Sequence, residues 1–225
     1  LLSSLSRMMP CNTCLGIQTS QSMTKIKRLC VFCGSSEGAR PEYLQAAVAL
    51  GEAMVVRGIG LVYGGANVGT MGQIASTVLA GGGEVIGVIP QGLVKKEVAY
   101  KELQDLRVVQ TMHERKSLMN ELSDGFISMP GGLGTFEEFF EALAWGQLGI
   151  HAKPSGILNI QNYYEKLLEF LDNAVAESFM QQEHRDMLLV HEDPATLLDL
   201  LETYKPPDVD KADWIKGRHR KNTTN

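Results

Sequence analysis

The sequence predicts an α/β protein with a Rossmann-like, doubly wound parallel sheet that carries helices on both faces. Two observations predict this fold class. Short apolar runs with strand composition alternate with helical patterns of about ten residues or more, which is typical of βαβ units. In addition, three glycine-rich turns each follow an expected strand and lead to an expected helix. Ligands bind at this edge of the sheet in such folds.

The expected elements follow one another in regular order along the chain. Pro41 favours a helix start, because its ring fixes the backbone angle that a first turn needs. Three glycines at 81–83 end the second helix, and Pro90 ends the third strand. The expected strands are Arg28–Cys33, Gly60–Tyr63, Glu84–Ile89, Leu106–Val109, Gly125–Met129, Ser155–Leu158 and Met187–Val190. The expected helices are Pro41–Arg57, Met71–Ala80, Met112–Leu122, Phe136–Leu148, Tyr163–Ala176 and Pro194–Tyr204.

The composition predicts one catalytic domain, residues 25–204, between a leader (1–24) and a basic tail (205–225). The leader is rich in Ser and Thr, and the first acidic residue of the chain is Glu37. We interpret the leader as disordered; the alternative is an organelle transit peptide, which has a similar acid-poor composition. We interpret the tail as flexible and solvated, with a weak localisation or anion-binding role as the alternative.

Charge and hydropathy narrow the class of partner. The formal net charge is -5, which argues against general nucleic-acid binding because that function needs a basic surface. No apolar run in the sequence is long enough to span a bilayer. We therefore expect a cytoplasmic protein that binds neither nucleic acid nor membrane.

The four cysteines have the spacing of a zinc ribbon, in two Cys-x2-Cys pairs. Cys30 and Cys33 fall within an expected strand, where side chains three positions apart face opposite sides of the sheet. Cys11 and Cys14 fall within the leader. We therefore expect no metal site, and we expect reduced thiols instead.

The most informative segment is Pro-Gly-Gly-Leu-Gly-Thr-Phe-Glu-Glu at 130–138, between an expected buried strand and an expected helix. This arrangement directs several backbone N–H groups and the positive end of a helix dipole at one point, where a phosphate binds well. Two further glycine turns are expected at the same edge of the sheet, and the three together favour a nucleotide-type crevice. Their residues are Gly34 with Ser35, and Gly64 and Gly65 with Gly69.

Other nucleotide and hydrolase motifs are missing from the sequence. There is no Gly-x-x-x-x-Gly-Lys-Ser/Thr, and Gly132-Leu133-Gly134 has no third glycine three residues later. His-Glu-x-x-His and Gly-x-Ser-x-Gly are also missing. The remaining interpretation is a cradle for a nucleoside monophosphate, without a dinucleotide cofactor.

Two basic residues can reach this crevice. Arg115 and Lys116 open the helix before the motif, and the starts of adjacent helices cluster at one edge of a parallel sheet. Arginine offers bidentate pairing to a phosphate or carboxylate, whereas lysine offers a point charge. The alternative is a solvated, charged helix face.

The acidic residues of the motif have competing interpretations. Glu138 can act on a bound nucleotide, but Thr135-x-x-Glu138 also has the spacing of a capping box, with Thr135 as the helix cap. We interpret Glu137 and Glu141 as a solvated pair.

These motifs resemble those of the LONELY GUY family, the cytokinin riboside 5′-monophosphate phosphoribohydrolases. The resemblance runs from about Lys27 to Tyr204, and it rests on the 130–138 motif together with Met112-His113-x-Arg115-Lys116. It implies hydrolysis of the N-glycosidic bond of an N6-modified adenosine 5′-monophosphate, which gives the free base and ribose 5-phosphate. It also implies a homodimer, with no metal and no cofactor.

The resemblance implies roles for individual residues. Arg115 and Glu138 correspond to the catalytic pair. Glu138 would stabilise an oxocarbenium-like cation at C1′ and orient or deprotonate the attacking water. Arg115 would hold the substrate and Glu138 in register. Contacts with substrate or phosphate fall on Glu97, Lys116, Gly131, Gly132, Leu133, Gly134, Thr135, Phe136 and Glu137.

Three positions depart from the family pattern, namely Ala66, Leu133 and Ala144. Leu133 and Ala144 are expected to border the pocket, so these departures concern the N6 substituent rather than the reaction. Two alternatives stay open: a general nucleosidase for AMP and other purine monophosphates, and a non-catalytic nucleotide or cofactor carrier of the same fold. Related sequences are sometimes called lysine decarboxylases, but no pattern here supports pyridoxal phosphate chemistry.

Overall fold

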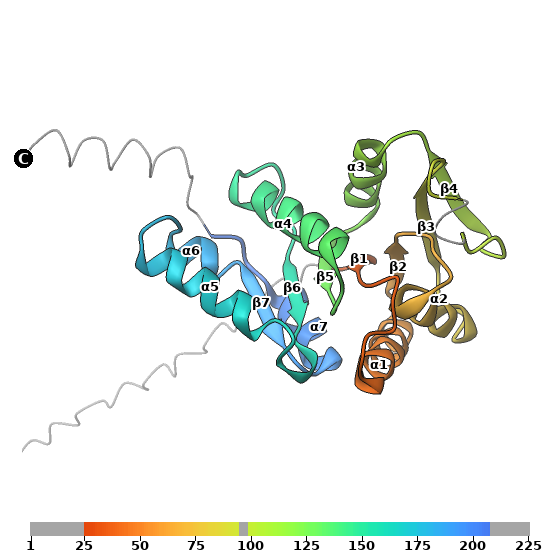
Figure 1. The fold of residues 1–225 in the computed structure, drawn as a ribbon, viewed down its shortest axis with the longest axis horizontal. Coiled ribbons are helices and arrows are strands. Elements are labelled where there is room, and N and C mark those ends of the chain that lie inside the picture. The colour runs from red at the N-terminus through yellow and green to blue at the C-terminus, as the bar shows by residue number, and fades with distance from the viewer. Residues whose placement is uncertain (1–24, 95–98, 208–225) are drawn as a thin grey trace, which may run out of the picture.

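The computed structural model describes residues 25–94 and 99–207, and these residues form one parallel seven-stranded sheet flanked by helices (Figure 1). The strands are β1 (Arg28–Phe32), β2 (Gly60–Tyr63), β3 (Val85–Pro90), β4 (Asp105–Val109), β5 (Gly125–Ser128), β6 (Ser155–Leu158) and β7 (Leu188–His191). The helices are α1 (Pro41–Arg57), α2 (Gly69–Ala80), α3 (Met112–Leu122), α4 (Leu133–Gln147), α5 (Glu165–Ala176), α6 (Gln182–Arg185) and α7 (Pro194–Thr203), with a 3-10 turn at Ile160–Asn162.

The strand order β4-β3-β2-β1-β5-β6-β7 places the reversal of direction between β1 and β5. From β1 the chain builds outward through β2, β3 and β4, and it then returns to add β5 on the other side of β1. Phe32 pairs with Ser128 at the carboxyl ends of these two strands. Ligands of doubly wound sheets bind outside the strand ends at such a switch point.

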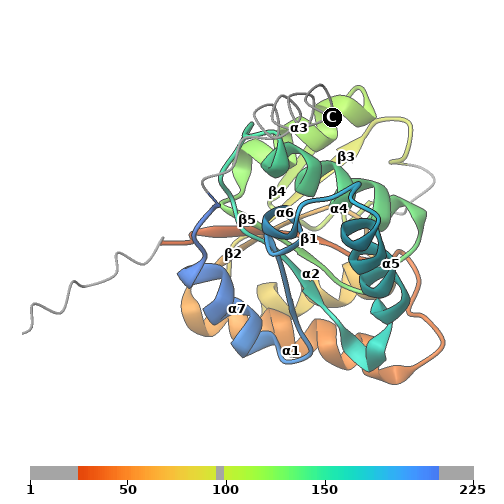
Figure 2. The ribbon, with the colours of Figure 1, turned by 90° about the vertical axis from the view of Figure 1, so that its left-hand side faces the viewer.

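Alternation of side chains along the buried strands creates two apolar layers. In β1, Leu29 and Val31 face the layer of α1, α2 and α7, whereas Cys30 and Phe32 face the layer of α3, α4 and α5. Figure 2 shows α3 and α4 on one side of the strands and α1 and α7 on the other. The predicted fold class, with helices on both faces, is therefore confirmed.

Most element boundaries agree with the sequence-based expectations, and α1, β2, α3 and β6 have the expected bounds. The larger differences lie at helix starts, and α5 begins at Glu165, two residues later than expected. α2 begins at Gly69, two residues earlier than expected, and α4 begins at Leu133 rather than Phe136. Glycines in a sequence suggest turns, but in this fold Gly69 and Gly134 lie in the first turns of α2 and α4. The short helix α6 was not expected.

The ends of the chain were assigned to a leader and a tail. Residues 1–24 and 208–225 lie outside the described residues, and 205–207 have neither helix nor strand structure. Among the residues described, no helix combines the length and the apolar character that a membrane crossing requires.

Candidate active site

The amino end of α4 is open to an incoming group. The cap residue Gly132 offers no side chain, and the first intrahelical bond runs from the Phe136 N–H to the Gly132 carbonyl. The N–H groups of Leu133, Gly134 and Thr135 therefore have no partner within the helix. Together with the helix dipole, they form an anion-binding end.

The predicted capping box at this helix is wrong. Thr135 is the third residue of α4 and is buried, so it cannot be the cap; the cap residue is Gly132, which has no side chain. Its side chain packs against the backbone at Gly131, where even an added Cβ would collide with it. The capping box that the Thr135-x-x-Glu138 spacing suggested is therefore not formed.

Open space lies in front of two motif glycines. A Cβ added to Gly132 or Gly134 would meet no heavy atom within 4 Å. These two glycines therefore keep the approach to the helix amino end clear, and their hydrogens leave room for a phosphate to lie close to the backbone.

Arg115 from α3 and Glu138 from α4 face each other across this space. The Arg115 Nη2 to Glu138 Oε1 distance is 3.4 Å, and their side chains are 7% and 10% exposed. The Nε of Arg115 is buried and has no hydrogen-bond partner. A buried guanidinium with an unused donor is well suited to bind an oxygen-rich ligand.

A crevice of about 260 Å³ joins these features at the switch point. It lies between the carboxyl ends of β1 and β2 and the amino end of α4. A volume of this size suits a small polar ligand, and its polar groups converge on one side. Its lining comprises Val31, Cys33, Gly34, Ser35, Gly64, Met71, Arg115, Gly132, Leu133, Gly134, Thr135 and Glu138.

The other two glycine turns shape the crevice floor. The Thr70 hydroxyl donates to the Gly34 carbonyl at 3.0 Å, which ties the turn after β2 to the end of β1. Gly64 approaches Arg115 so closely that a Cβ there would overlap the guanidinium. Gly65 and Gly69 do not line the crevice. Their φ values are +78° and +59°, and glycine adopts this left-handed backbone conformation easily, so both residues allow the turn after β2.

Several predicted site residues lie outside the crevice lining. Lys116 and Glu137 pair with each other at the α3–α4 boundary. Phe136 packs toward α5, and Gly131 lies directly against the Thr135 side chain. Glu97 lies outside the described residues.

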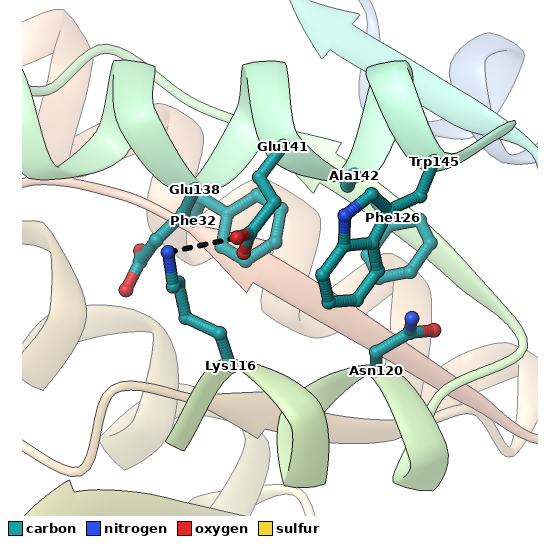
Figure 3. A pocket seen from close by; sticks show the side chains of 8 residues that line it. All are labelled: Phe32, Lys116, Asn120, Phe126, Glu138, Glu141, Ala142 and Trp145. Atoms are coloured by element: carbon teal, nitrogen blue, oxygen red, sulfur yellow. Dashed lines mark hydrogen bonds and ion pairs between the residues drawn. The ribbon is translucent and has the colours of Figure 1, made fainter. Parts of the chain in front are cut away.

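The interpretation of Glu137 and Glu141 as a solvated pair is correct only in part: Glu137 is 54% exposed and Glu141 26%, and both pair with Lys116. The Lys116 Nζ pairs with both carboxylates. Figure 3 shows its bond to Glu141 Oε1, at 2.9 Å. Burial lowers the pKa of Lys116, but the hydrogen bonds to Glu137 and Glu141 outweigh that effect and raise it overall. Lys116 is therefore charged at neutral pH.

A second cavity of about 320 Å³ adjoins the crevice, and sequence reasoning did not find it. It shares Gly34, Ser35 and Gly132 with the crevice. The rest of its lining comprises Ser36, Glu37, Gly38, Tyr43, Thr70, Pro130, Gly131 and Tyr163. The Tyr163 hydroxyl donates to the Gly131 carbonyl at 2.6 Å. No local pattern marks a tyrosine that reaches a distant glycine, so the sequence held no signal for this contact.

Cys30 and Cys33 are not placed to share a metal ion, and Cys11 and Cys14 lie outside the described residues. Cys30 and Cys33 are free and buried in opposite apolar layers, as their spacing predicted. No group of three His, Cys, Asp or Glu residues suited to a metal ion occurs in the described part of the chain. Burial raises the pKa of the Cys33 thiol to about 12, so this crevice residue is a neutral thiol at pH 7.

The fold and the crevice together define a Rossmann-like protein with an anion-binding helix end at its switch point. A family model described as "Possible lysine decarboxylase" matches residues 71–201. The chain is 50% identical over 183 residues to the rice (Oryza sativa subsp. japonica) protein "Probable cytokinin riboside 5'-monophosphate phosphoribohydrolase LOGL9", covering 81% of each chain. It is 44% identical over 208 residues to the Arabidopsis thaliana "Cytokinin riboside 5'-monophosphate phosphoribohydrolase LOG7", covering 88% of this chain and 96% of the relative. The chain belongs to this LONELY GUY family.

Solved structures confirm the fold at lower sequence identity. The molybdenum cofactor binding protein from Rippkaea orientalis has a TM-score of 0.59 at 24% identity, covering 80% of this chain and 97% of that chain. The molybdenum cofactor carrier protein from Chlamydomonas reinhardtii has a TM-score of 0.58 at 20% identity, covering 80% and 98%. These similarities show the shared architecture and carry no argument about ligand.

Proposed function

We propose that this chain hydrolyses the N-glycosidic bond of N6-modified adenosine 5′-monophosphates, which gives the free base and ribose 5-phosphate. The observation that carries the proposal is the buried Arg115–Glu138 pair beside the uncapped amino end of α4. Relatives at 44–50% identity are named for this reaction. The family model's description as a lysine decarboxylase gains no support from the crevice, since no lysine is among its described lining residues.

The substrate phosphate is proposed to bind the free N–H groups at the start of α4. Gly132 and Gly134 leave the approach open, and Leu133, Gly134 and Thr135 supply the donors. The phosphate does not react, so its binding free energy serves to hold the ribose C1′ near the catalytic pair. A nucleoside without the phosphate is therefore a poor substrate.

Glu138 is proposed to act at C1′. As the C1′–N bond breaks, its electron pair goes to the base nitrogen, and positive charge develops on the ribose ring. The carboxylate stabilises that charge and accepts a proton from the water that adds to C1′. The departing base takes up one proton, so the products are the free base and ribose 5-phosphate.

Arg115 is proposed to orient the Glu138 carboxylate and to bind the substrate through its unused Nε. A guanidinium stays protonated at any working pH. The Arg115 guanidinium also lies directly against Gly64, which restricts its position. Arg115 therefore contributes orientation and charge rather than proton transfer.

The domain bounds, the cellular compartment and the oligomeric state are proposals as well. We propose a single catalytic domain at 25–204, a cytoplasmic enzyme and a homodimer. The dimer gains support from an exposed aromatic groove between α4 and α5, where Phe140, Tyr163 and Phe170 are 36%, 40% and 65% exposed. Sedimentation of the Phe170→Glu variant tests it: a monomer supports this face as the interface, whereas an unchanged dimer places the interface elsewhere.

The deciding experiment is base release by the wild type and the Glu138→Gln variant. Glutamine keeps the shape but removes the charge. It also leaves the buried Arg115 guanidinium without its ion-pair partner, so the melting temperature is measured together with base release. We expect kcat to fall by about 10²–10⁴-fold. Glu52→Gln, at an exposed position on α1, serves as the control with normal activity. Normal turnover by Glu138→Gln would refute the assigned role.

Substrate choice separates the proposed function from its alternatives. Equal kcat/KM for AMP and for its N6-isopentenyl derivative would favour a general purine-monophosphate nucleosidase. Tight binding of both nucleotides without any base release would favour the carrier.

A further inference from the structure

Two consecutive tyrosines hold the backbone that leads into α4. Tyr163 and Tyr164 follow the 3-10 turn after β6. The Tyr163 hydroxyl donates to the Gly131 carbonyl at 2.6 Å, and the Tyr164 hydroxyl donates to the Met129 carbonyl at the same distance. Pro130 lies between these two carbonyls and has no N–H group with which to hold itself. Side chains from a distant part of the chain therefore fix the start of the glycine motif.

The two hydroxyls differ in how closely they are tied to packing. Tyr164 is 1% exposed and belongs to the apolar layer of α4 and α5, where a buried hydroxyl needs a partner. Tyr163 is 40% exposed, and its ring packs edge-on against Tyr43 and Tyr164, with centroid distances of 5.9 Å and 5.0 Å. Burial raises the pKa of Tyr163, so its hydroxyl stays protonated and can donate at neutral pH. Its ring contacts do not involve the hydroxyl, so the bond to Gly131 can be removed without changing them.

The Tyr163 bond sets the orientation of one peptide unit. The Gly131 carbonyl and the Gly132 N–H belong to the same planar unit, which we name the Gly131–Gly132 peptide. The described residues contain no cis peptide bond, so this unit is trans and its C=O and N–H groups point in opposite directions. Gly132 borders both the crevice and the second cavity, whereas Tyr163 and Gly131 border only the second of these two. A carbonyl held toward Tyr163 therefore directs the Gly132 N–H toward the crevice.

This peptide unit would rotate easily without a restraint. Neither of its residues has a Cβ, and open space lies in front of Gly132. The Gly132 N–H also precedes the first intrahelical bond, so α4 does not hold it. Rotation would replace an N–H donor at the crevice with the Gly131 carbonyl oxygen, which would repel a phosphate.

The turn that carries Tyr163 has an uncommon backbone. Gln161 and Asn162 have φ of +54° and +55°, in the left-handed region that residues other than glycine seldom adopt. The Asn159 side chain accepts from the Tyr164 N–H at 2.8 Å and stabilises the turn. Such a backbone persists where surrounding contacts fix it, and it is frequent at functional sites. Here it brings the Tyr163 hydroxyl to the glycine motif.

We propose that Tyr163 is a positioning residue for the substrate phosphate: its hydroxyl holds the Gly131–Gly132 peptide so that the Gly132 N–H joins the donors at the start of α4. The inference rests on the proposed function and adds a donor that the helix end alone does not fix. It implies that the hydroxyl matters for a substrate with a 5′-phosphate and not for one without it.

The test is Tyr163→Phe, which removes the hydroxyl and keeps the ring. The Kd of ribose 5-phosphate, measured by calorimetry, should rise by about 10-fold, because a charge-assisted hydrogen bond to the phosphate is weakened. The kcat/KM for the nucleoside 5′-monophosphate should fall by a similar factor. The kcat/KM for the corresponding nucleoside, although low, should stay within about twofold of the wild-type value.

Tyr43→Phe is the matched control. Tyr43 borders the same cavity and packs against Tyr163, and among the described residues its hydroxyl makes no hydrogen bond. This variant should behave as wild type with both substrates.

NMR separates positioning from direct contact. In the ligand-free protein, the shift of the Gly132 amide nitrogen should move in Tyr163→Phe, because the carbonyl of the same peptide unit loses its donor. An unmoved shift together with weaker ribose 5-phosphate binding would overturn the inference and make the Tyr163 hydroxyl a direct phosphate ligand.

Two other results would also overturn it. One is an unchanged Kd for ribose 5-phosphate in folded Tyr163→Phe. The other is an equal loss of kcat/KM for nucleotide and nucleoside, which a general change of structure or assembly would produce. Failure of the proposed function would show differently, as missing base release by the wild-type enzyme, while calorimetry would still report whether Tyr163 controls phosphate affinity.

Discussion

Gly64 provides the sharpest test of the catalytic geometry, because it touches Arg115 without being able to react. An alanine Cβ at Gly64 would lie well inside the contact distance of the Arg115 Nη2 atom, and 3.0 Å from Met71 Sδ. Both neighbours are the far ends of flexible side chains, so Gly64→Ala should fold. The guanidinium must then retreat by about 1 Å from a position that is 3.4 Å from Glu138.

A displacement of about 1 Å can cost about 10²-fold in rate, which corresponds to about 2.7 kcal/mol of transition-state stabilisation. We therefore expect Gly64→Ala to lower kcat/KM for base release by about two orders of magnitude, with a melting temperature near that of the wild type. Gly92→Ala is the matched control, since a Cβ there meets nothing within 4 Å. Wild-type kcat/KM in a folded Gly64→Ala enzyme would show that Arg115 need not hold this position.

Three other predictions test the phosphate end, the thiol and the pH dependence. Gly134→Ala should raise KM for the nucleotide, because the methyl enters the phosphate space, while stabilising α4 by up to about 1 kcal/mol; unchanged KM would contradict the phosphate site. Iodoacetamide at pH 8 should label Cys33 far more slowly in the folded protein than in urea, since its thiol pKa is about 12; equal rates would contradict this. Burial and the Lys153 charge lower the pKa of His151, so the unfolded chain binds the proton more readily and stability should fall as pH drops below about 6.5. Thermal unfolding of His151→Gln should show a weaker loss over that window, and parallel curves would refute the assignment.

The fold could be predicted from the sequence because its determinants are local or periodic. Buried parallel strands appear as short apolar runs, and amphipathic helices between them have a distinct period. The opposite orientation of Cys30 and Cys33 followed from the strand period alone. The strand order is a tertiary property, and the sequence predicted only that a switch point should exist.

Capping shows where local rules stop being sufficient. The pattern Thr-x-x-Glu occurs at Thr111–Glu114 and at Thr135–Glu138. At the start of α3 it does cap: the Thr111 hydroxyl accepts from the Glu114 N–H, and the Glu114 carboxylate accepts from the Gln110 N–H. At α4 the helix starts earlier, at Leu133, so Thr135 falls inside it. The same spacing therefore had opposite meanings, and only the position of the helix start separates them.

The pairing of charges around α4 also explains how an acidic helix can accept a phosphate. The three glutamates of α4, Glu137, Glu138 and Glu141, would repel an anion at its amino end if they were unpaired. Lys116 offsets Glu137 and Glu141, and Arg115 faces Glu138. The N–H groups of the first turn can then attract the phosphate, while one carboxylate stays directed at the reacting sugar. Removing Lys116 should therefore leave Glu137 and Glu141 unpaired and weaken phosphate binding, and raising the salt concentration should reduce that loss.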